Sequence, residues 1–249
     1  EGVANLSEWY FEKFATDESS TEGLFEDYDH PNTRVTHLTV DHELPMTFWR
    51  AVGHSYTAFA KESMIDELSQ AAGMDEVAFR LQNTQNSPRL NNVIRVAGEH
   101  MAKMNPPAGH HLGFAAHHSF RTDVAEIAEV SVEKGKIRVH KVTCVLDCGQ
   151  AVNPDIVRSQ MEGGVIYGLT AALYGGLSLE GGAIKESNFH DYPMLRLNES
   201  PEIEVIIIDS GTKPTGVGEP GLPPIAPAVA NAVFKATGQR VRSLPLQLA

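Results

Sequence analysis

Between Ser55 and Gly73 the apolar residues recur three or four positions apart, which is the spacing of a helix with one buried face. Gly73 stands where a helix C-cap belongs, so the pattern predicts a helix over residues 56–72. Asp75 is a suitable N-cap for a second, shorter helix, and residues 91–104 have the pattern of a third helix followed by two prolines. This part of the chain is therefore predicted to be helical.

The segments on either side of these helices follow other patterns. Residues 33–45 predict a β-rich start that is closed by a proline, whereas residues 105–113 concentrate proline and glycine and predict a loop. We expect this loop to separate two domains, residues 1–108 and residues 109–249. The first would join the β-rich start to the helices, and the second would be an α+β subdomain.

Beyond residue 113 the period of the sequence becomes that of strands. Alternate positions from Val124 to Val132 share one strand face, the segment KGK supplies a turn, and IRVHKVTCVLD continues as a partner strand. This arrangement predicts a β-hairpin in an antiparallel sheet.

Two further helices are predicted in the last hundred residues. Asn153 followed by Pro154 is a typical helix start, and it leads into a long helix whose glycines each cost about 1 kcal/mol relative to alanine. Such glycines suggest that something packs close to the helix backbone. Residues 201–209 predict a strand, and a loop rich in proline and glycine leads from it into a helix that ends at Gly238. Together the elements predict an α+β fold with helices packed on largely antiparallel sheets.

The charge balance excludes some partners. Lys and Arg number 20 against 32 Asp and Glu, and the net charge of −12 disfavours binding to nucleic acid or to anionic membranes. No apolar run approaches the roughly 18–20 residues that span a bilayer, so this segment is not expected to insert into a membrane. The first residue is Glu rather than Met, which predicts a piece of a longer protein. Any export signal would then lie upstream, and the compartment, cytoplasmic or periplasmic, stays open.

The two cysteines, Cys144 and Cys148, stand four positions apart. This spacing is neither CxxC nor half of a recognised zinc or iron-sulfur pattern, so both are predicted to be buried thiols. So few cysteines cannot hold an iron-sulfur cluster in this chain. Any electron acceptor must therefore come from a partner or from another segment.

Three residues are candidates for chemistry on local grounds. Glu219 lies in the loop GVGEPG, where little bulk surrounds it, and it could act as a general base or be an acidic residue in a surface turn. Gln160, in QMEGGVIYGL, could donate to a ligand that lies against bare helix backbone, or it could face solvent. Arg50, in TFWRAVGHS, could bind an oxyanion or an aromatic substrate, or it could be an ordinary surface residue.

The paired histidines invite a metal-site interpretation. The pairs are His110 with His111 and His117 with His118, but neighbours on an extended segment point to opposite sides and rarely chelate one ion. We therefore expect loop histidines without a metal. The absence of GxSxG from the sequence argues against a serine hydrolase, and the absence of a P-loop argues against nucleotide phosphate binding.

Three separated segments, in this order, resemble the molybdenum-binding subunit of the xanthine oxidase family, and most closely its isoquinoline 1-oxidoreductase-like and aldehyde dehydrogenase-like branch. They are TFWRAVGHSYTAFAKESMIDELSQAAG, LDCGQAVNPDIVRSQMEGGVIYGL and GVGEPGLPPIAPAVANAVFKATGQRVRSLPL. The resemblance covers roughly residues 30–249. It implies a bacterial oxidoreductase that hydroxylates an N-heterocycle or oxidises an aldehyde, with water as the source of oxygen.

The resemblance also assigns roles to residues. Glu219 would be the catalytic base, and Arg50 would bind the substrate, although AVGHS after it departs from the consecutive glycines of xanthine oxidase. The cofactor would be a molybdenum pterin, in its cytosine dinucleotide form, with no protein side chain on the metal. The residues expected on the cofactor side are Gln160, Gly163, Gly164 and Gly218.

The family's glutamine loop and its serine-rich cofactor loop are both absent from this sequence. The resemblance therefore implies the C-terminal portion of a large subunit, inactive as the isolated chain. It would work with the N-terminal half of that subunit, a small iron-sulfur subunit and a small-molecule substrate. The alternatives are an assembly or binding module of the same scaffold that lacks the cofactor and, less favoured, a hydrolase that needs no molybdenum.

Overall fold

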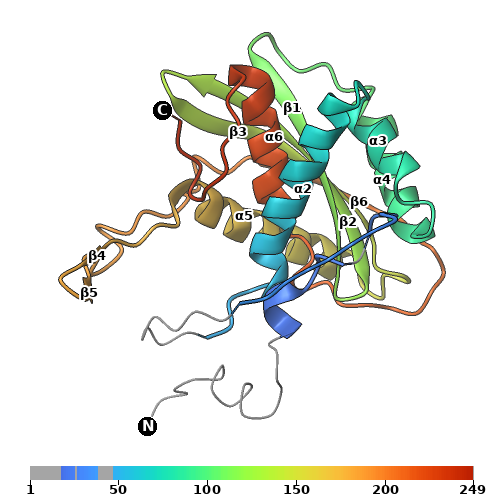
Figure 1. The fold of residues 1–249 in the computed structure, drawn as a ribbon, viewed down its shortest axis with the longest axis horizontal. Helices are drawn as coiled ribbons and strands as arrows, with labels where there is room; N and C mark the ends of the chain where they lie inside the picture. Colours follow the sequence, from blue (N-terminus) through green and yellow to red (C-terminus); the bar gives the residue numbers. More distant parts are fainter. Residues whose placement is uncertain (1–17, 26, 39–46, 249) are drawn as a thin grey trace.

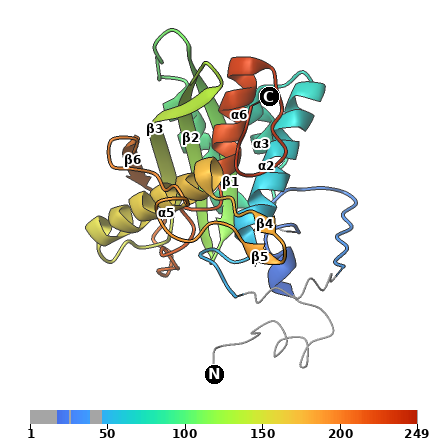
Figure 2. The same cartoon turned by 90° about the vertical axis from the view of Figure 1, so that its left-hand side faces the viewer.

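A four-stranded sheet lies between helices on its two faces. The computed structural model describes residues 18–25, 27–38 and 47–248 (Figure 1). The sheet has the order β1-β2-β3-β6, and α4 packs on one face while α5 and α6 pack on the other (Figures 1 and 2). Its strands are β1 (His110–Ser119), β2 (Thr122–Glu133), β3 (Lys136–Asp147) and β6 (Glu202–Ile207).

The helices form where the sequence predicts them, with shifted ends. They are α2 (His54–Ala71), α3 (Glu76–Gln82), α4 (Pro88–Met101), α5 (Pro154–Tyr174) and α6 (Ile225–Thr237), after a short 3-10 helix, η1 (Glu18–Thr21). The carboxylate of Asp75 accepts from the first backbone N–H groups of α3, and the side chain of Asn153 does the same for α5. The third helix begins at Pro88 rather than at residue 91, because proline fits the first turn of a helix.

The predicted loop over residues 105–113 is wrong in its second half, because β1 begins at His110. The paired histidines therefore lie on a strand and not in a loop. Helices cover both faces of this strand. Its sequence therefore lacks the simple alternation of polar and apolar residues by which a half-exposed strand is recognised. The β-rich start is also wrong for residues 33–38, where the chain forms no strand, and residues 39–46 lie outside the described residues.

The hairpin of β2 and β3 forms as predicted, and β1 joins it on the other side of β2, so both of these pairs are antiparallel. Strand β6 pairs with β3 in the parallel direction, from Lys141 opposite Glu202 to Leu146 opposite Ile207. A parallel pair needs a long crossover connection, which α5 and the segment after it provide. The loop that follows β6 is thereby brought to the end of the sheet where α5 begins.

A buried polar network joins the first half of the chain to the sheet. The carboxylate of Glu62 on α2 accepts from Tyr28 Oη at 2.6 Å, from Arg80 Nε at 2.9 Å and from the backbone N–H of Ala116 at 2.9 Å. Ala116 lies on β1, which is an edge strand, so this bond satisfies an edge donor that would otherwise be buried without a partner. Burial and the nearby Glu62 carboxylate raise the pKa of Tyr28 well above its usual value, which keeps the phenol a donor.

The division of the chain into two domains at residue 108 remains a prediction.

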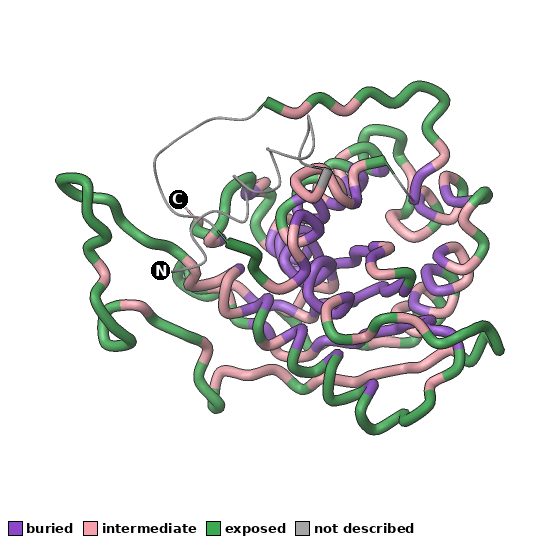
Figure 3. Tube along the Cα trace, turned by 90° about the horizontal axis from the view of Figure 1, so that it is seen from below, coloured by how far each residue is buried: buried purple, intermediate pink, exposed green. Residues whose placement is uncertain are grey.

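Between α5 and β6 the chain leaves the body of the molecule as an extended arm, residues 175–200, which carries the short strands β4 (Leu179–Glu180) and β5 (Ala183–Ile184) (Figure 1). Figure 3 shows that the arm is mostly exposed, whereas the buried residues gather in the sheet and on the helix faces packed against it. Its exposed apolar side chains are Leu177, Leu179, Ile184, Phe189, Met194 and Leu197. A hydrogen bond from Tyr174 Oη to Glu199 Oε1, 3.0 Å long, closes the base of the arm.

Helix α6 lies directly on the backbone of β1 at Gly113. A Cβ atom at Gly113 would lie 2.1 Å from the carbonyl oxygen of Ala228 and 2.3 Å from the backbone nitrogen of Ala232. We expect Gly113→Ala to lower the free energy of unfolding by about 1–3 kcal/mol, because the helix must move away from the sheet. Urea unfolding of the isolated chain measures this.

The matched control is Gly176→Ala, because a Cβ atom there would meet nothing closer than Pro245 at 3.5 Å. Its free energy of unfolding should stay within about 0.5 kcal/mol of the wild type. Equal unfolding midpoints for the two variants would contradict the close packing at Gly113.

Candidate functional site

Arg50 and the loop GVGEPG meet although they are 168 positions apart in the sequence. Arg50 Nε donates to the carbonyl oxygen of Gly218 at 2.8 Å, and Arg50 Nη2 donates to the same oxygen. Nη2 also lies 3.3 Å from Gln160 Oε1 and donates to it. The structure thus brings together three of the residues that the sequence singles out.

Glu219 completes this cluster. Its Oε1 atom accepts from the backbone N–H of Ala51, the residue after Arg50, at 3.0 Å. The side chain is half-buried, and the carboxylate is held at the turn before α2 instead of extending into solvent. Glu219 is therefore held in position beside an open face.

The loop that carries Glu219 is attached to the end of the β1–β2 hairpin. Thr122 Oγ1 donates to the carbonyl oxygen of Gly216 at 2.6 Å, and the N–H of Gly216 donates to the carbonyl oxygen of Phe120 at 3.3 Å. The N–H of Leu222 donates back to the carbonyl oxygen of Glu219 at 3.0 Å, so the loop forms a tight turn. These bonds set the position of Glu219 before α6 begins.

The glycines of α5 fall into two groups. A Cβ atom at Gly164 would lie 3.0 Å from the carbonyl carbon of Gly221, and one at Gly168 would lie 2.5 Å from the side chain of Ile225. The close neighbour that the sequence predicts is therefore the chain's own loop and the start of α6. Gly163 differs, because it is exposed and a Cβ atom there would meet nothing closer than Arg50 Nη1 at 3.9 Å.

An aromatic pair flanks the cluster and was not predicted from the sequence. The rings of Trp49 and Tyr167 stack with centroids 4.9 Å apart, and the guanidinium of Arg50 lies 5.8 Å from the centroid of Tyr167. Both rings are about 40% exposed, at 41% for Trp49 and 40% for Tyr167. The position of Tyr167, two helical turns after Gln160, places both on one helix face and is the signal that could have identified it.

The histidines of β1 belong to polar contacts away from this cluster. His117 is fully buried and its Nε2 lies 2.9 Å from His54 Nδ1, and burial lowers the pKa of His54 to about 4. His118 Nδ1 bonds to Asp123 Oδ1 at 2.8 Å, and Arg89 Nε lies 3.7 Å from Asp123 Oδ2. Across the part of the chain that the structure describes, no three His, Cys, Asp or Glu side chains group as metal ligands do.

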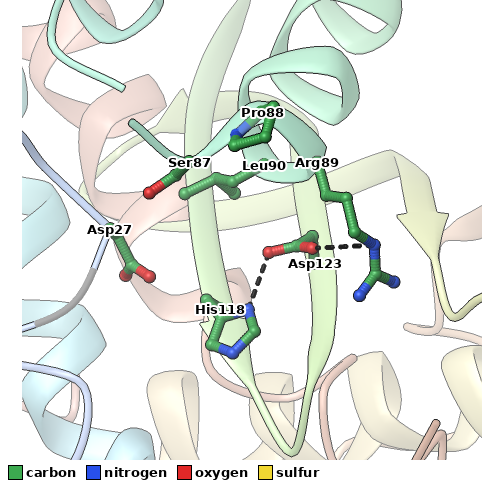
Figure 4. Close-up of a pocket in the computed structure, with 7 residues that line it drawn as sticks. All are labelled: Asp27, Ser87, Pro88, Arg89, Leu90, His118 and Asp123. Carbon is green, nitrogen blue, oxygen red and sulfur yellow. Dashed lines mark hydrogen bonds and ion pairs between the residues drawn. The ribbon is translucent and has the colours of Figure 1, made fainter. Parts of the chain in front are cut away.

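His118, Asp123 and Arg89 line a cavity of about 300 Å³, together with Asp27 and the residues at the start of α4. Figure 4 shows these lining residues. None of the residues around this cavity belongs to the predicted site. The Glu219 cluster is instead an open face, since Gln160, Gly163 and Gly218 are exposed.

Two predictions about the remaining chain can be compared directly with the structure. Cys144 and Cys148 are both buried free thiols, as predicted. Burial raises the pKa of the Cys144 thiol well above its usual value. Among the helices that the structure describes, none has the length and apolar character needed to cross a membrane.

Comparison with protein families identifies two matches. A family described as a molybdopterin cofactor-binding domain matches residues 51–201, and a second family with the same description matches residues 10–84. Among solved structures, the aldehyde oxidoreductase from Desulfovibrio desulfuricans has a TM-score of 0.66 and 16% identity, over 80% of this chain and 40% of that chain. This likeness concerns the fold and agrees with the α+β prediction.

Two characterised relatives are more similar in sequence. The beta subunit of isoquinoline 1-oxidoreductase from Brevundimonas diminuta is 35% identical, over 98% of this chain and 32% of its own length. A nicotinate dehydrogenase subunit from Pseudomonas putida is 33% identical, over 88% of this chain and 20% of its own length. The chain therefore spans a third or less of the length of these relatives.

The two neighbouring glycines of α5 provide a test of the packing beneath Glu219. Gly164→Ala should lower the free energy of unfolding by about 1–3 kcal/mol, because its Cβ atom would press on the backbone of Gly221. Gly163→Ala should raise it by up to about 1 kcal/mol, because alanine favours the helix and its Cβ atom meets open space. Chemical unfolding of the isolated chain measures the free energy of unfolding of both variants. Changes of the same sign in the two variants would contradict this packing.

Proposed function

Because this chain belongs to the family of molybdopterin cofactor-binding domains, we propose that it is the C-terminal part of a molybdenum hydroxylase or aldehyde oxidoreductase of the xanthine oxidase family. The observation that carries the proposal is the convergence of Arg50, Gln160 and Glu219 on one open face. These residues come from three separate segments, and each was singled out by its own motif.

The groups on this face suit a pterin cofactor. Arginine can only donate, so its bond to Gln160 Oε1 sets the orientation of that amide and leaves the amide N–H groups for a ligand. The bare backbone of Gly163 and Gly218 would let a flat, polar ligand approach closely, since a Cβ atom at either position would occupy this space. Gln160, Gly163 and Gly218 would then contact the cofactor, while Gly164 supports the loop behind them.

Glu219 is the general base in this proposal. When bound, the molybdenum pterin supplies the two-electron redox chemistry for hydroxylation of a carbon centre with oxygen from water. Glu219 accepts the proton released in that reaction, at the carboxylate that the N–H of Ala51 holds in place. Arg50 binds the substrate through its guanidinium, which is already oriented by Gly218 and Gln160.

The substrate, the form of the cofactor and the partners are also proposals. The names of the two relatives point to isoquinoline and nicotinate, and the exposed rings of Trp49 and Tyr167 suit an aromatic substrate such as an N-heterocycle or an aromatic aldehyde. The cytosine dinucleotide form of the pterin is the one we propose. Because Cys144 and Cys148 are buried free thiols, the cluster that accepts the electrons would belong to a separate iron-sulfur subunit, and the remainder of the large subunit would cover the open face.

Glu219→Gln in the assembled enzyme tests the proposed base. The amide has the same shape but cannot accept the proton, so kcat should fall by about a hundredfold to ten-thousandfold while the protein still folds. Isoquinoline, nicotinate and benzaldehyde serve as substrates, each with a dye as electron acceptor.

The control is Glu99→Gln on α4, an exposed glutamate on the other face of the sheet, which should leave kcat unchanged. Full turnover in Glu219→Gln would exclude Glu219 as the base. If the wild-type assembly held the cofactor but turned over none of the three substrates, a binding module would be the better description.

The isolated chain should carry little molybdenum, because much of the family's pterin-binding sequence is absent from it. Elemental analysis of the chain, produced in a bacterium that makes the cofactor, measures the metal content. One molybdenum per chain would contradict the division of the cofactor site between this chain and another segment.

A further inference from the structure

The turn between Arg50 and α2 has an unusual backbone. Ala51 has φ +73° and Val52 has φ +47°, so two consecutive residues that carry side chains adopt the left-handed region. This region is unfavourable for an L-residue, and a β-branched residue such as valine is a genuine outlier there. Glycine would adopt the same backbone without strain, yet neither position is glycine.

Contacts on several sides hold this strained turn. The N–H of Val52 donates to the carbonyl oxygen of Trp49 at 2.9 Å, and Ser55 Oγ donates to the carbonyl oxygen of Val52 at 2.8 Å. On the inner side, a Cβ atom at Gly53 would lie 1.9 Å from the carbonyl oxygen of Ser19. The short helix η1, which contains Ser19, therefore packs directly against the turn. The surrounding structure therefore imposes the left-handed conformation.

The turn directs two donors at the Glu219 loop. The N–H of Ala51 bonds to Glu219 Oε1 at 3.0 Å, and Arg50 Nε bonds to the carbonyl oxygen of Gly218 at 2.8 Å. A residue in the ordinary right-handed or extended region at position 52 would carry the chain in another direction. Strain of this kind persists in proteins where the conformation is needed for function.

We propose that Val52 is a positioning residue, whose left-handed backbone orders the turn so that the Ala51 N–H and the Arg50 guanidinium hold Glu219 in place. The proposal rests on the assignment of Glu219 as the base and adds to it the element that sets the position of this base. Val52 acts through its backbone, so its effect should depend on which backbone conformations the residue at this position allows.

Substitutions that forbid or permit positive φ separate the backbone effect from the loss of the side chain. Val52→Pro cannot adopt positive φ and lacks the N–H that donates to Trp49, whereas glycine and asparagine adopt the left-handed turn with less strain than valine. We expect Val52→Pro to speed amide hydrogen exchange at Ala51 by about tenfold or more, and Val52→Gly and Val52→Asn to leave it at or below the wild-type rate. NMR of the isolated chain measures this without any cofactor.

The same variants are then assayed in the assembled enzyme. Val52→Pro should lower kcat by about tenfold or more with little change in KM, because a displacement of about 1 Å can cost a hundredfold. Val52→Gly and Val52→Asn should retain turnover, and the melting temperature of Val52→Asn should rise by about 2–4 °C as strain is relieved. If Val52→Pro fails to assemble, Ser55→Ala removes one bond to the turn and should lower kcat in the same direction.

Lys134 provides the matched control, because it also has positive φ, at +50°, but lies in the exposed β2–β3 turn. Lys134→Pro should leave both Ala51 exchange and turnover unchanged. Loss of turnover in both Val52→Gly and Val52→Asn would mean that the isopropyl group itself is needed, and unchanged exchange and turnover in Val52→Pro would show that the turn does not need positive φ at this residue. Either result would overturn the proposal, while the assignment of Glu219 would still depend on Glu219→Gln.

Discussion

The candidate site depends on the direct contact of one backbone with another at positions without side chains. Gly113 lets α6 lie on β1, and Gly164 lets α5 lie against the backbone at Gly221. These contacts are short because no Cβ atom intervenes, and they place the loop between β6 and α6 beside the turn before α2. The bonds from Arg50 and Ala51 to this loop depend on this packing of the helices.

Much of the fold could be predicted from local patterns. The caps at Asp75 and Asn153 and the left-handed glycine at residue 238 mark helix ends through their own backbone chemistry, which does not depend on the rest of the molecule. Strand β1 could not be recognised in this way, because helices cover both its faces. The parallel pairing of β6 was also hidden, since pairing direction follows from the connection between strands.

The site shows the same division between local and long-range information. Each of the three candidates, Arg50, Gln160 and Glu219, lies in a segment of unusual composition. Each could therefore be identified as a candidate from the sequence alone. Their meeting across 168 positions is a tertiary property. The strained backbone at Ala51 and Val52 could not be predicted at all, since nothing in these two residue types favours positive φ and the surrounding contacts alone impose it.

The arm between α5 and β6 differs from the rest of the chain in how it is attached. Its two ends meet at the hydrogen bond between Tyr174 and Glu199, so the sheet and the helices α4, α5 and α6 on its faces are complete without the exposed part of the arm. The free energy of closing such a loop grows only slowly with its length, by roughly 0.6 kcal/mol for each doubling. Insertions and deletions within residues 177–193 should therefore be tolerated during evolution, which makes this arm a place where homologous enzymes can diverge in size without altering their catalytic centre.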